Sequence, residues 1–550
     1  MNPRYLTVAA FVAVAAAAVS TRACGQEPTQ PAPGVRLGLS YPRGTTPKVI
    51  VMPVDSTPGD SVRTMIQRDL DYSDRVTPLV LDDMTLMGLT PAPGQDYNYS
   101  LFANLGVAAI VQAKRIPSGF DVALYDVSAK RRLTSQIFRV SGVPPNRDAT
   151  LLDSITVSTT TREKALRDSV YRVLKGRADV MRRPRLTKDT RDRRFVVRDS
   201  IRRDSAAAAY LKRNLSRWED DRRDSVALSI TRTASRMARE DSLVRLAAED
   251  AQRINVHHIS DEVERWITGR SGIAATRIAY VQNGLIRVVD SDGFNDKPIT
   301  KRGLSLSPAW HPSGRKLVYS KFLEGGAGTQ LEEVDFATGR TRTLSAGGLN
   351  ITPAYSHDGR YVVYASGNES GTDLMMVAVD SPGVVQRLTF GRGSDNGSPT
   401  FSPDGRQIAF FSSRSKYPQI YTMDADGTNV QLLTPFTPGV RSYRAAPDWS
   451  PDGRSVAFEQ QNGDFQVWMI NVRDKEPRQL TSEGENEGPS WAPDGRHISL
   501  SSTRGGSKQI WILDTESGRF RQLTHNAGAR LSARSPVDKD NRQQPASDSQ

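Results

Sequence analysis

The chain of 550 residues is long enough for two or three domains, each with a hydrophobic core, and its 37% hydrophobic and 25% charged residues are typical of globular proteins. Its single cysteine excludes an intrachain disulfide and a zinc site built from several cysteines. The net charge of +13 would suit a nucleic acid, an anionic membrane surface or an acidic partner, so the position of the basic residues has to decide between them.

The first 34 residues carry the pattern of an exported protein. A basic residue precedes an apolar, Ala-rich run at residues 6–19 that is too short to span a membrane, and small residues stand before Cys24. This predicts a signal peptide over residues 1–23 and a Pro-rich tether over residues 24–34. Cleavage before Cys24 would expose the residue that bacterial lipoproteins acylate. Lipidation of Cys24 and export without a lipid both stay open.

Residues 35–143 are expected to form a small α/β domain. The apolar run at residues 48–54 is typical of a buried strand, and Val62, Ile66 and Leu70 follow at helical spacing. Further apolar runs, the last two in a hairpin pattern, continue the alternation of strands and helices. This order of elements predicts one layered α/β unit.

Residues 144–252 have the composition of a charged, mainly helical insertion. Gly176 is the only glycine, and Leu211, Leu215 and Trp218 lie at helical spacing. Up to residue 250 the segment holds 26 Lys and Arg residues against 17 Asp and Glu residues, which is nine of the thirteen excess positive charges. A basic interaction arm and a solvated insertion laced with ion pairs are the two interpretations, and the pattern favours the second. We therefore expect no nucleic-acid partner for the folded domains.

One pattern of eight residues occurs five times in the C-terminal half. Its glycine stands at positions 314, 359, 405, 453 and 495, which are 45, 46, 48 and 42 residues apart. Each copy precedes further strand-like segments, and four strands in about 45 residues describe one blade of a β-propeller. The copies are PAWHPSGR, PAYSHDGR, PTFSPDGR, PDWSPDGR and PSWAPDGR.

The residue types of this pattern have structural roles. The leading proline suits the start of a strand because it lacks an N–H donor, and the aromatic residue is expected to pack between neighbouring blades. The following Pro, Asp and Gly predict a tight hairpin turn in which glycine supplies a positive φ. The repetition is thus mostly structural, since stacked blades bury sheet faces that a single blade leaves open.

Six blades are expected over residues 278–537. Residues 278–300 supply three outer strands without a first strand, and residues 533–540 resemble a first strand that lacks the aromatic residue and the glycine. One blade would combine both ends of the propeller, and residues 538–550 would form a disordered tail. The predicted fold is multi-domain, with a small N-terminal α/β domain, a charged helical insertion and a C-terminal six-bladed all-β propeller.

Two segments outside the repeats carry a family resemblance. Residues 257–281 read HHISDEVERWITGRSGIAATRIAYV, and residues 35–54 read VRLGLSYPRGTTPKVIVMPV. With the repeats, they resemble the TolB family of Gram-negative cell-envelope proteins, in which such segments form the joining helix (residues 253–277 here) and the N-terminal arm with its first strand. The resemblance covers about residues 35–140 and 253–537. Three features depart from the family, namely the insertion, the Pro-rich spacer and the candidate lipidation site at Cys24.

The resemblance implies a function. Family membership would make the chain a non-catalytic periplasmic protein of the Tol–Pal system that supports outer-membrane integrity and cell division. The family binds a peptidoglycan-associated lipoprotein, Pal, through the propeller face and the inner-membrane protein TolA through the N-terminal arm. The resemblance therefore assigns the TolA-like contact to Val35 and Arg36. Acylation of Cys24 would add peripheral membrane anchoring.

Partner specificity is expected in the loops that precede each repeated pattern. In a propeller these loops gather on one face around the channel mouth, and they are where the copies differ. The resemblance places the docking of a Pal-like lipoprotein on this face. The residues expected to contact the partner are Asn350, Thr352, Asn396, Tyr443, Arg444 and Glu487.

The sequence indicates neither an enzyme nor a metal protein. It has no HExxH motif and no Gly-x-Ser-x-Gly elbow, and the calcium-loop fragments at residues 290–293 and 424–427 lack the remaining ligands. We expect no catalytic residue, metal or cofactor. An exported propeller hydrolase or a glycan-binding sensor that uses the channel stays open as an alternative, and carboxylates and histidines converging on one channel mouth would favour it.

Overall fold

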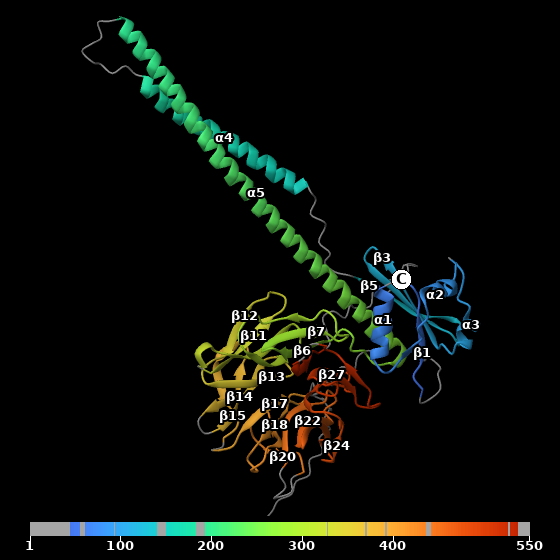
Figure 1. Cartoon of the computed structure of the whole chain (residues 1–550). Coiled ribbons are helices and arrows are strands. Elements are labelled where there is room, and N and C mark those ends of the chain that lie inside the picture. The colour runs from blue at the N-terminus through green and yellow to red at the C-terminus, as the bar shows by residue number, and fades with distance from the viewer. Residues whose placement is uncertain are drawn as a thin grey trace, which may run out of the picture.

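The computed structural model describes residues 45–54, 61–92, 94–139, 150–182, 193–326, 328–368, 371–390, 393–435, 442–525 and 528–536. The predicted signal peptide and tether, Cys24, Val35, Arg36 and the predicted C-terminal tail lie outside these residues. Figure 1 shows three parts, which are a small α/β domain, a long helical hairpin and a propeller. None of the described helices has an apolar stretch long enough to cross a lipid bilayer.

The N-terminal domain is built on a five-stranded sheet in the order β2-β1-β3-β4-β5, in which β1 runs parallel to β2 and β3. Strand β1 alternates, so that Val49 and Val51 face one layer of the core while Ile50 and Met52 face the other. Its strands are β1 (Lys48–Val51), β2 (Thr77–Pro78), β3 (Ala109–Ile116), β4 (Gly119–Asp126) and β5 (Arg131–Arg139). Its helices are α1 (Ser61–Tyr72), α2 (Asp83–Leu89) and α3 (Tyr99–Asn104).

Helix α1 confirms the predicted helical face, because Val62, Ile66 and Leu70 are all buried in the first core layer. Helices α2 and α3 cover the opposite face of the sheet through Leu86 and Phe102. The side chains of Asp82 and Asn98 accept N–H groups at the starts of α2 and α3, as N-cap residues do.

The predicted insertion forms an antiparallel pair of helices, α4 (Thr150–Arg182) and α5 (Arg193–Thr268). Helix α5 has 76 residues and is therefore about 114 Å long at 1.5 Å per residue. Ala178 and Ala207 are buried between the two helices, and Arg167 pairs with Glu219 at 2.7 Å. Most of the hairpin projects away from the two folded domains (Figure 1).

The same helix continues into the predicted joining segment without a break. Its C-terminal turns place Val256, Ile259, Val263, Trp266 and Ile267 in the core of the N-terminal domain. The helix ends at Thr268, where Gly269 has a φ of 74° and its N–H donates to the carbonyl of Arg265. The predicted boundary between the insertion and the joining helix, at residues 252 and 253, therefore lies inside helix α5 and does not separate two elements.

The propeller has six sheets of four strands, which confirms the predicted blade count. The first sheet joins β29 (Arg530–Arg534) to β6 (Arg277–Gln282), β7 (Leu285–Asp290) and β8 (Lys297–Pro298). The second contains β9 (Ser305–Trp310), β10 (Lys316–Phe322), β11 (Thr329–Asp335) and β12 (Thr341–Ser345). The third contains β13 (Leu349–Tyr355), β14 (Tyr361–Asn368), β15 (Gly371–Ala378) and β16 (Ser381–Arg387).

The remaining three blades follow the same order around the ring. The fourth contains β17 (Asn396–Phe401), β18 (Gln407–Ser412), β19 (Gln419–Asp424) and β20 (Gln431–Leu432). The fifth contains β21 (Tyr443–Trp449), β22 (Ser455–Asn462), β23 (Asp464–Asn471) and β24 (Pro477–Gln479). The sixth contains β25 (Asn486–Trp491), β26 (His497–Ser502), β27 (Gln509–Asp514) and β28 (Phe520–Gln522).

A C-terminal strand closes the ring, as predicted, but it spans Arg530–Arg534 instead of the predicted residues 533–540, of which 537–540 lie outside the described residues. Ala533 of β29 pairs with Ala279 of β6, in the way that Ala309 pairs with Val318 in the next blade. This register puts Arg534 at the position that an aromatic residue occupies in the other blades. Arg534 is buried, so a guanidinium replaces the aromatic ring at the closure.

The repeated pattern has the structural role expected of it. Trp310, Tyr355, Trp449 and Trp491 are buried, and Tyr355 packs on Val318 of the preceding blade. In the hairpin turn of the fourth blade, Asp404 accepts the hydroxyl of Ser402 at 2.6 Å and the N–H of Arg406 at 3.1 Å. The turn and the interblade packing thus use the residues that recur.

The helical hairpin is predicted to be dispensable for the two folded domains. Replacing residues 150–248 by a short Gly/Ser linker should change the free energy of unfolding by less than about 1 kcal/mol, because the α5 residues that pack in the core of the N-terminal domain all follow this segment. In contrast, Ile259→Ala should cost about 2–5 kcal/mol. Denaturant unfolding followed by circular dichroism measures both, and loss of cooperative unfolding in the linker variant would show that the hairpin belongs to the core.

Candidate partner-binding face and interdomain junction

A repeated backbone irregularity surrounds one end of the channel. In each blade the first strand has a β-bulge, where two of its residues face one residue of the next strand. The first bulge residue has a φ between 46° and 58°, which strains any residue except glycine. We call this end of the ring the propeller mouth. Its six bulge residues are Ser307, Thr352, Ser398, Ala446, Gly488 and Leu531.

A groove with a volume of about 220 Å³ opens at the propeller mouth. Ile351 and Phe411 give it apolar walls, and Thr352 and Tyr443 place hydroxyl groups at it. The N–H of Ser398 donates to Oγ1 of Thr352 at 3.1 Å, which ties two neighbouring blades together at this point. The groove therefore combines apolar surface with a few polar groups, as binding sites commonly do.

Two of the six residues predicted as partner contacts line this groove. Thr352 belongs to the bulge, and Tyr443 is 37% exposed with its ring edge-to-face on Phe465 at 5.6 Å. Phe411 and Gly397 also line the groove. Phe411 lies in the second strand of its blade, away from the segments before the pattern, whereas Gly397 lies in such a segment but was not among the six predicted contacts.

Asn350 and Asn396 do not offer side chains to a partner in this structure. Both are 1% exposed. The amide of Asn350 donates to the carbonyl oxygens of Thr329 and Gly347, and that of Asn396 donates to the carbonyl oxygen of Thr372. A buried amide in a strand start satisfies backbone acceptors, so we assign these two residues a positioning role instead of the predicted contact.

Arg444 and Glu487 lie in the first strands of the fifth and sixth blades, which are neighbours. The guanidinium of Arg444 donates to Gln460 at 2.7 Å and to Gln419 at 2.8 Å, and burial lowers its pKa. Glu487 pairs with Lys508 at 2.8 Å. Beside it, burial raises the pKa of Glu459 to about 7, and that carboxylate accepts the N–H of Gly488. Both predicted residues are thus held by neighbours of the same chain.

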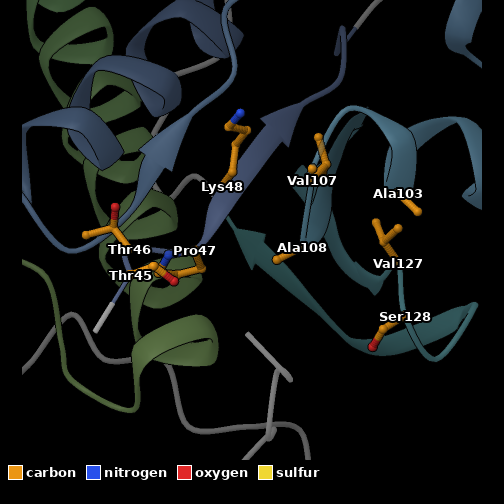
Figure 2. Close-up of a pocket in the computed structure, with 10 residues that line it drawn as sticks. Thr45, Thr46, Pro47, Lys48, Ala103, Val107, Ala108, Val127 and Ser128 are labelled. Atoms are coloured by element: carbon orange, nitrogen blue, oxygen red, sulfur yellow. The ribbon is translucent and has the colours of Figure 1, made fainter. Parts of the chain in front are cut away.

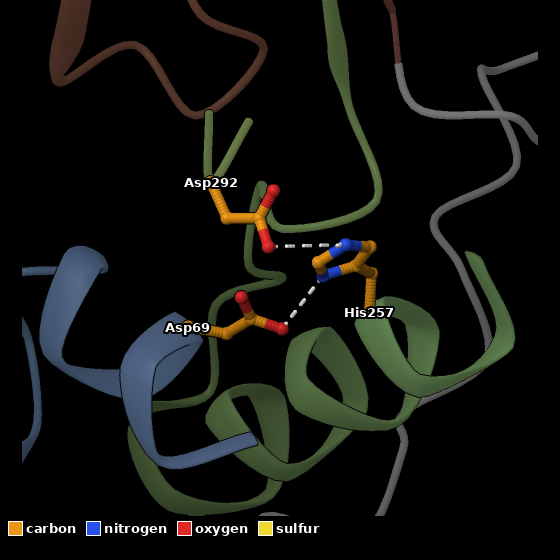
Figure 3. Close-up of side chains that lie close together, drawn as sticks. All are labelled: Asp69, His257 and Asp292. Carbon is orange, nitrogen blue, oxygen red and sulfur yellow. Dashed lines mark hydrogen bonds and ion pairs between the residues drawn. The ribbon is translucent and has the colours of Figure 1, made fainter. Parts of the chain in front are cut away.

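A second cluster of functional groups joins the N-terminal domain to the propeller. Asp69 of α1, His257 of α5 and Asp292, which follows β7, are all buried and lie together in Figure 3. Nδ1 of His257 is 2.8 Å from Asp69, and its Nε2 is 3.7 Å from Asp292. Ser260 also donates to Asp69 at 2.7 Å. His257 and Ser260 are three residues apart on the helix, so both side chains reach the carboxylate of Asp69.

Asp261 fixes the chain where it leaves α5. Its carboxylate accepts the N–H of Ala274 at 2.6 Å and that of Ala275 at 3.1 Å, and burial raises its pKa to about 8. A Cβ added to Gly272 would lie 2.4 Å from this carboxylate, so the loop passes too closely for a side chain. The first strand of the propeller thus starts at a defined position relative to the helix.

Further ion pairs cross the same junction. Arg75, which follows α1, lies 3.0 Å from Glu264 of α5 and 3.4 Å from Asp494 of the propeller. Burial raises the pKa of Glu264 to about 7. His497 lies between Asp494 at 2.7 Å and Asp74 at 3.2 Å. These charged groups form a network between the N-terminal domain and the sixth blade.

The cluster of Asp69, His257 and Asp292 does not fit a divalent metal ion. Asp292 contacts the guanidinium groups of Arg68 and Arg253, so its oxygens already have cationic partners. A metal ligand set built from Asp69, His257 and Asp292 would bring a third cation against two arginines.

A pocket of about 410 Å³ lies in the N-terminal domain, next to the start of the described chain (Figure 2). Its lining is mostly apolar, with Val107 and Val127 on one side and Pro47 on the other, and Lys48 is its charged residue. Among the residues that line it there is no carboxylate or imidazole that would serve as a general base.

Comparisons with known proteins agree with this architecture. A family model described as the TolB beta propeller domain matches residues 264–441 and 438–542. The Tol-Pal system protein TolB of Bordetella pertussis (strain Tohama I) is 38% identical over 192 residues, which is 34% of this chain and 43% of that protein. The protein TolB homolog of Chlorobium chlorochromatii is 35% identical over 172 residues, or 30% of this chain and 38% of that protein.

The chain spans only about two fifths of the length of these curated relatives, with 43% and 38% of their residues matched. The crystal structure of TolB from Acinetobacter baumannii superimposes with a TM-score of 0.59 at 19% identity and covers 90% of this chain and 97% of that chain. At this identity the likeness shows the fold of both domains.

The carboxylate of Asp261 is predicted to be essential for the stability of the junction. Asp261→Ala would leave two buried N–H groups without acceptors and should cost at least about 2 kcal/mol of unfolding free energy. The neighbouring Glu262, which pairs with Arg265 at the surface, provides the matched control, and Glu262→Ala should cost less than about 1 kcal/mol. Equal stability of the two variants in a denaturant titration would contradict this role.

Proposed function

Because the chain belongs to the TolB β-propeller family, we propose that it is a non-catalytic periplasmic component of a Tol–Pal system. In this proposal the propeller mouth binds a peptidoglycan-associated lipoprotein of the Pal type, and this binding supports outer-membrane integrity and cell division. The observation that carries it is the groove at the mouth, where Thr352 and Tyr443 lie among apolar side chains.

The groove supports a protein partner in two ways. Interface hot spots are rich in aromatic residues that sit in partly buried pockets, and Tyr443 has this setting. The strained bulges also hold the surrounding backbone in one conformation, so the surface is preorganised and loses little entropy on binding. Arg444 and Glu487 add opposite charges on the neighbouring fifth and sixth blades, which would orient a partner.

The N-terminal segment completes the proposal. By family membership, the arm with Val35 and Arg36 would contact a TolA-like inner-membrane protein, and Cys24 would anchor the mature chain if it is acylated. These residues lie outside the described part of the chain. One acyl chain binds a bilayer weakly, so stable anchoring would need the several chains of a lipoprotein. Mass spectrometry of the mature N-terminus distinguishes an acylated Cys24 from plain export.

The carboxylates at the mouth favour this function over a hydrolase or a glycan sensor in the channel. Glu485 and Glu487 both pair with Lys508, and Glu459 accepts a backbone N–H. These interactions within the chain give the three carboxylates a structural role, which does not require a catalytic one. His311 and His497 belong to the hairpin turns at the opposite ends of the first strands, away from these carboxylates.

Loss of the groove side chains is predicted to weaken partner binding. Thr352→Ala combined with Tyr443→Ala should reduce the affinity of the mature protein for a Pal from the same organism by about 30-fold, or about 2 kcal/mol. Tyr361→Ala is the matched control, because Tyr361 is 39% exposed but follows the turn at the other end of its blade. Calorimetry or biolayer interferometry measures the three affinities.

Two outcomes would count against the proposal. If the double variant is folded and binds as tightly as the wild type, the partner uses another surface. If the wild type does not bind Pal, the proposed Tol–Pal role fails and the channel-sensor alternative takes its place.

A further inference from the structure

Two histidines lie at the contact between the N-terminal domain and the propeller, and both have the same surroundings. Each ring has a carboxylate oxygen next to both of its nitrogens. For His257 these belong to Asp69 and Asp292, and for His497 they belong to Asp494 and Asp74. In each pair, one carboxylate comes from the N-terminal domain and the other from the propeller.

The hydrogen-bond partners of these rings indicate whether each imidazole is neutral or protonated. An ionised carboxylate only accepts hydrogen bonds, whereas a neutral imidazole has one N–H donor and one lone pair. A neutral His497 would therefore point a lone pair at Asp494 or at Asp74, which lie at 2.7 and 3.2 Å. Only the imidazolium form donates on both sides.

The same reasoning applies to His257. Its Nδ1 forms a 2.8 Å hydrogen bond with Asp69, and its buried Nε2, which has no hydrogen-bond partner among the described residues, faces Asp292 at 3.7 Å. The second proton turns this contact from a repulsion into an ion pair across the domain boundary.

The charge balance around His257 also favours a proton. Three carboxylates and two guanidinium groups surround the ring and sum to one negative charge, which one proton neutralises and a divalent cation would overcompensate. These groups are Asp69 and Arg68 of α1, Arg253 of α5, and Asp290 and Asp292 of the propeller. Arg521 of β28 forms no ion pair with these groups among the described contacts, but it attracts both Asp69 and Asp292 and offsets part of this negative charge.

The ring of His497 has an equally complete shell of charged groups. Asp494 and Asp74 raise its pKa although burial lowers it, and the neighbouring carboxylate groups raise the pKa of His257 in the same way. The charged groups that face His497 are Asp74 and Arg75 after α1, Glu264 of α5, Asp494 of its own turn, Asp514 of β27 and Arg534 of β29. Arg496 and Arg519 pair with Asp514 and Asp74 in turn.

We propose that His257 and His497 are two proton-binding sites that clamp the N-terminal domain onto the propeller, so that loss of their protons loosens the contact. The clamp connects α1 and α5 to the loop after β7 and to the turn before β26. It acts independently of any partner at the propeller mouth.

The direction of the pH dependence follows from the protons bound. A histidine whose pKa is raised by folding contributes stability that is fully present below its ordinary pKa of about 6.5 and is lost as the pH rises through the raised value. The contact should therefore be tight near pH 6 and loosen at alkaline pH. Asp261 and Glu264, whose pKa values burial raises to about 8 and about 7, act in the same direction, so variants must isolate the histidines.

The test is hydrogen exchange by mass spectrometry on the full chain at pH 6 and pH 8.5, corrected for the intrinsic exchange rate. Each unit of pKa shift corresponds to a tenfold change in the opening equilibrium. We expect protection of residues 69–75 and 285–294 to fall at least about tenfold between the two pH values. His257→Gln with His497→Gln should have low protection at both. The control His357→Gln changes an exposed turn histidine and should behave as wild type.

Histidine-ring NMR of the wild type makes the test independent of variant folding. Two of its histidine signals should keep their protons to a higher pH than a free imidazole side chain, whose pKa is about 6.5. The proposal is overturned if wild-type protection does not depend on pH, or if the double variant keeps the wild-type pH slope. It is also overturned if no histidine titrates above a pH of about 6.5.

Discussion

Closure of the ring by β29 and β6 is the constraint on which the rest of the structure depends. The N–H of Ser535 donates to the carbonyl of Arg277 at 2.7 Å, and the N–H of Arg277 donates to the Ser535 hydroxyl at 2.8 Å. This pairing joins residues about 258 positions apart and defines where β6 begins. Because Asp261 holds the loop before β6 to α5, closure also fixes the helix, and with it the N-terminal domain, against the propeller. The propeller mouth and the interdomain junction therefore lie on the two opposite faces of one closed ring of blades.

Repetition explains why so much of the fold could be predicted from the sequence. A turn built from Ser402, Asp404 and a glycine needs only neighbouring residues, and it recurs with the same hydrogen bonds at Ser450 and Asp452. Packing of Tyr355 between blades follows from the period of the repeat. Closure by the C-terminal strand was also predictable from spacing, although the burial of Arg534 in place of an aromatic ring was not.

The sites were less predictable because they depend on contacts between distant residues. Loop position alone made Asn350 and Asn396 look like surface groups, whereas the bulged strand turns both amides toward backbone carbonyls. The pairing of His257 with Asp69 joins residues 188 positions apart, and local patterns carry no signal for it. At the junction, the sequence gives a family resemblance, and only the folded chain shows which charges meet.

The central claim is that the partner binds at the propeller mouth, and site-specific photocrosslinking in intact cells tests it most directly. A photoreactive amino acid at position 443 should crosslink the protein to an outer-membrane lipoprotein that mass spectrometry identifies as Pal-like. The same amino acid at position 361, at the opposite end of the third blade, should give no such product. Crosslinking of that lipoprotein from position 361 but not from position 443 would contradict the account.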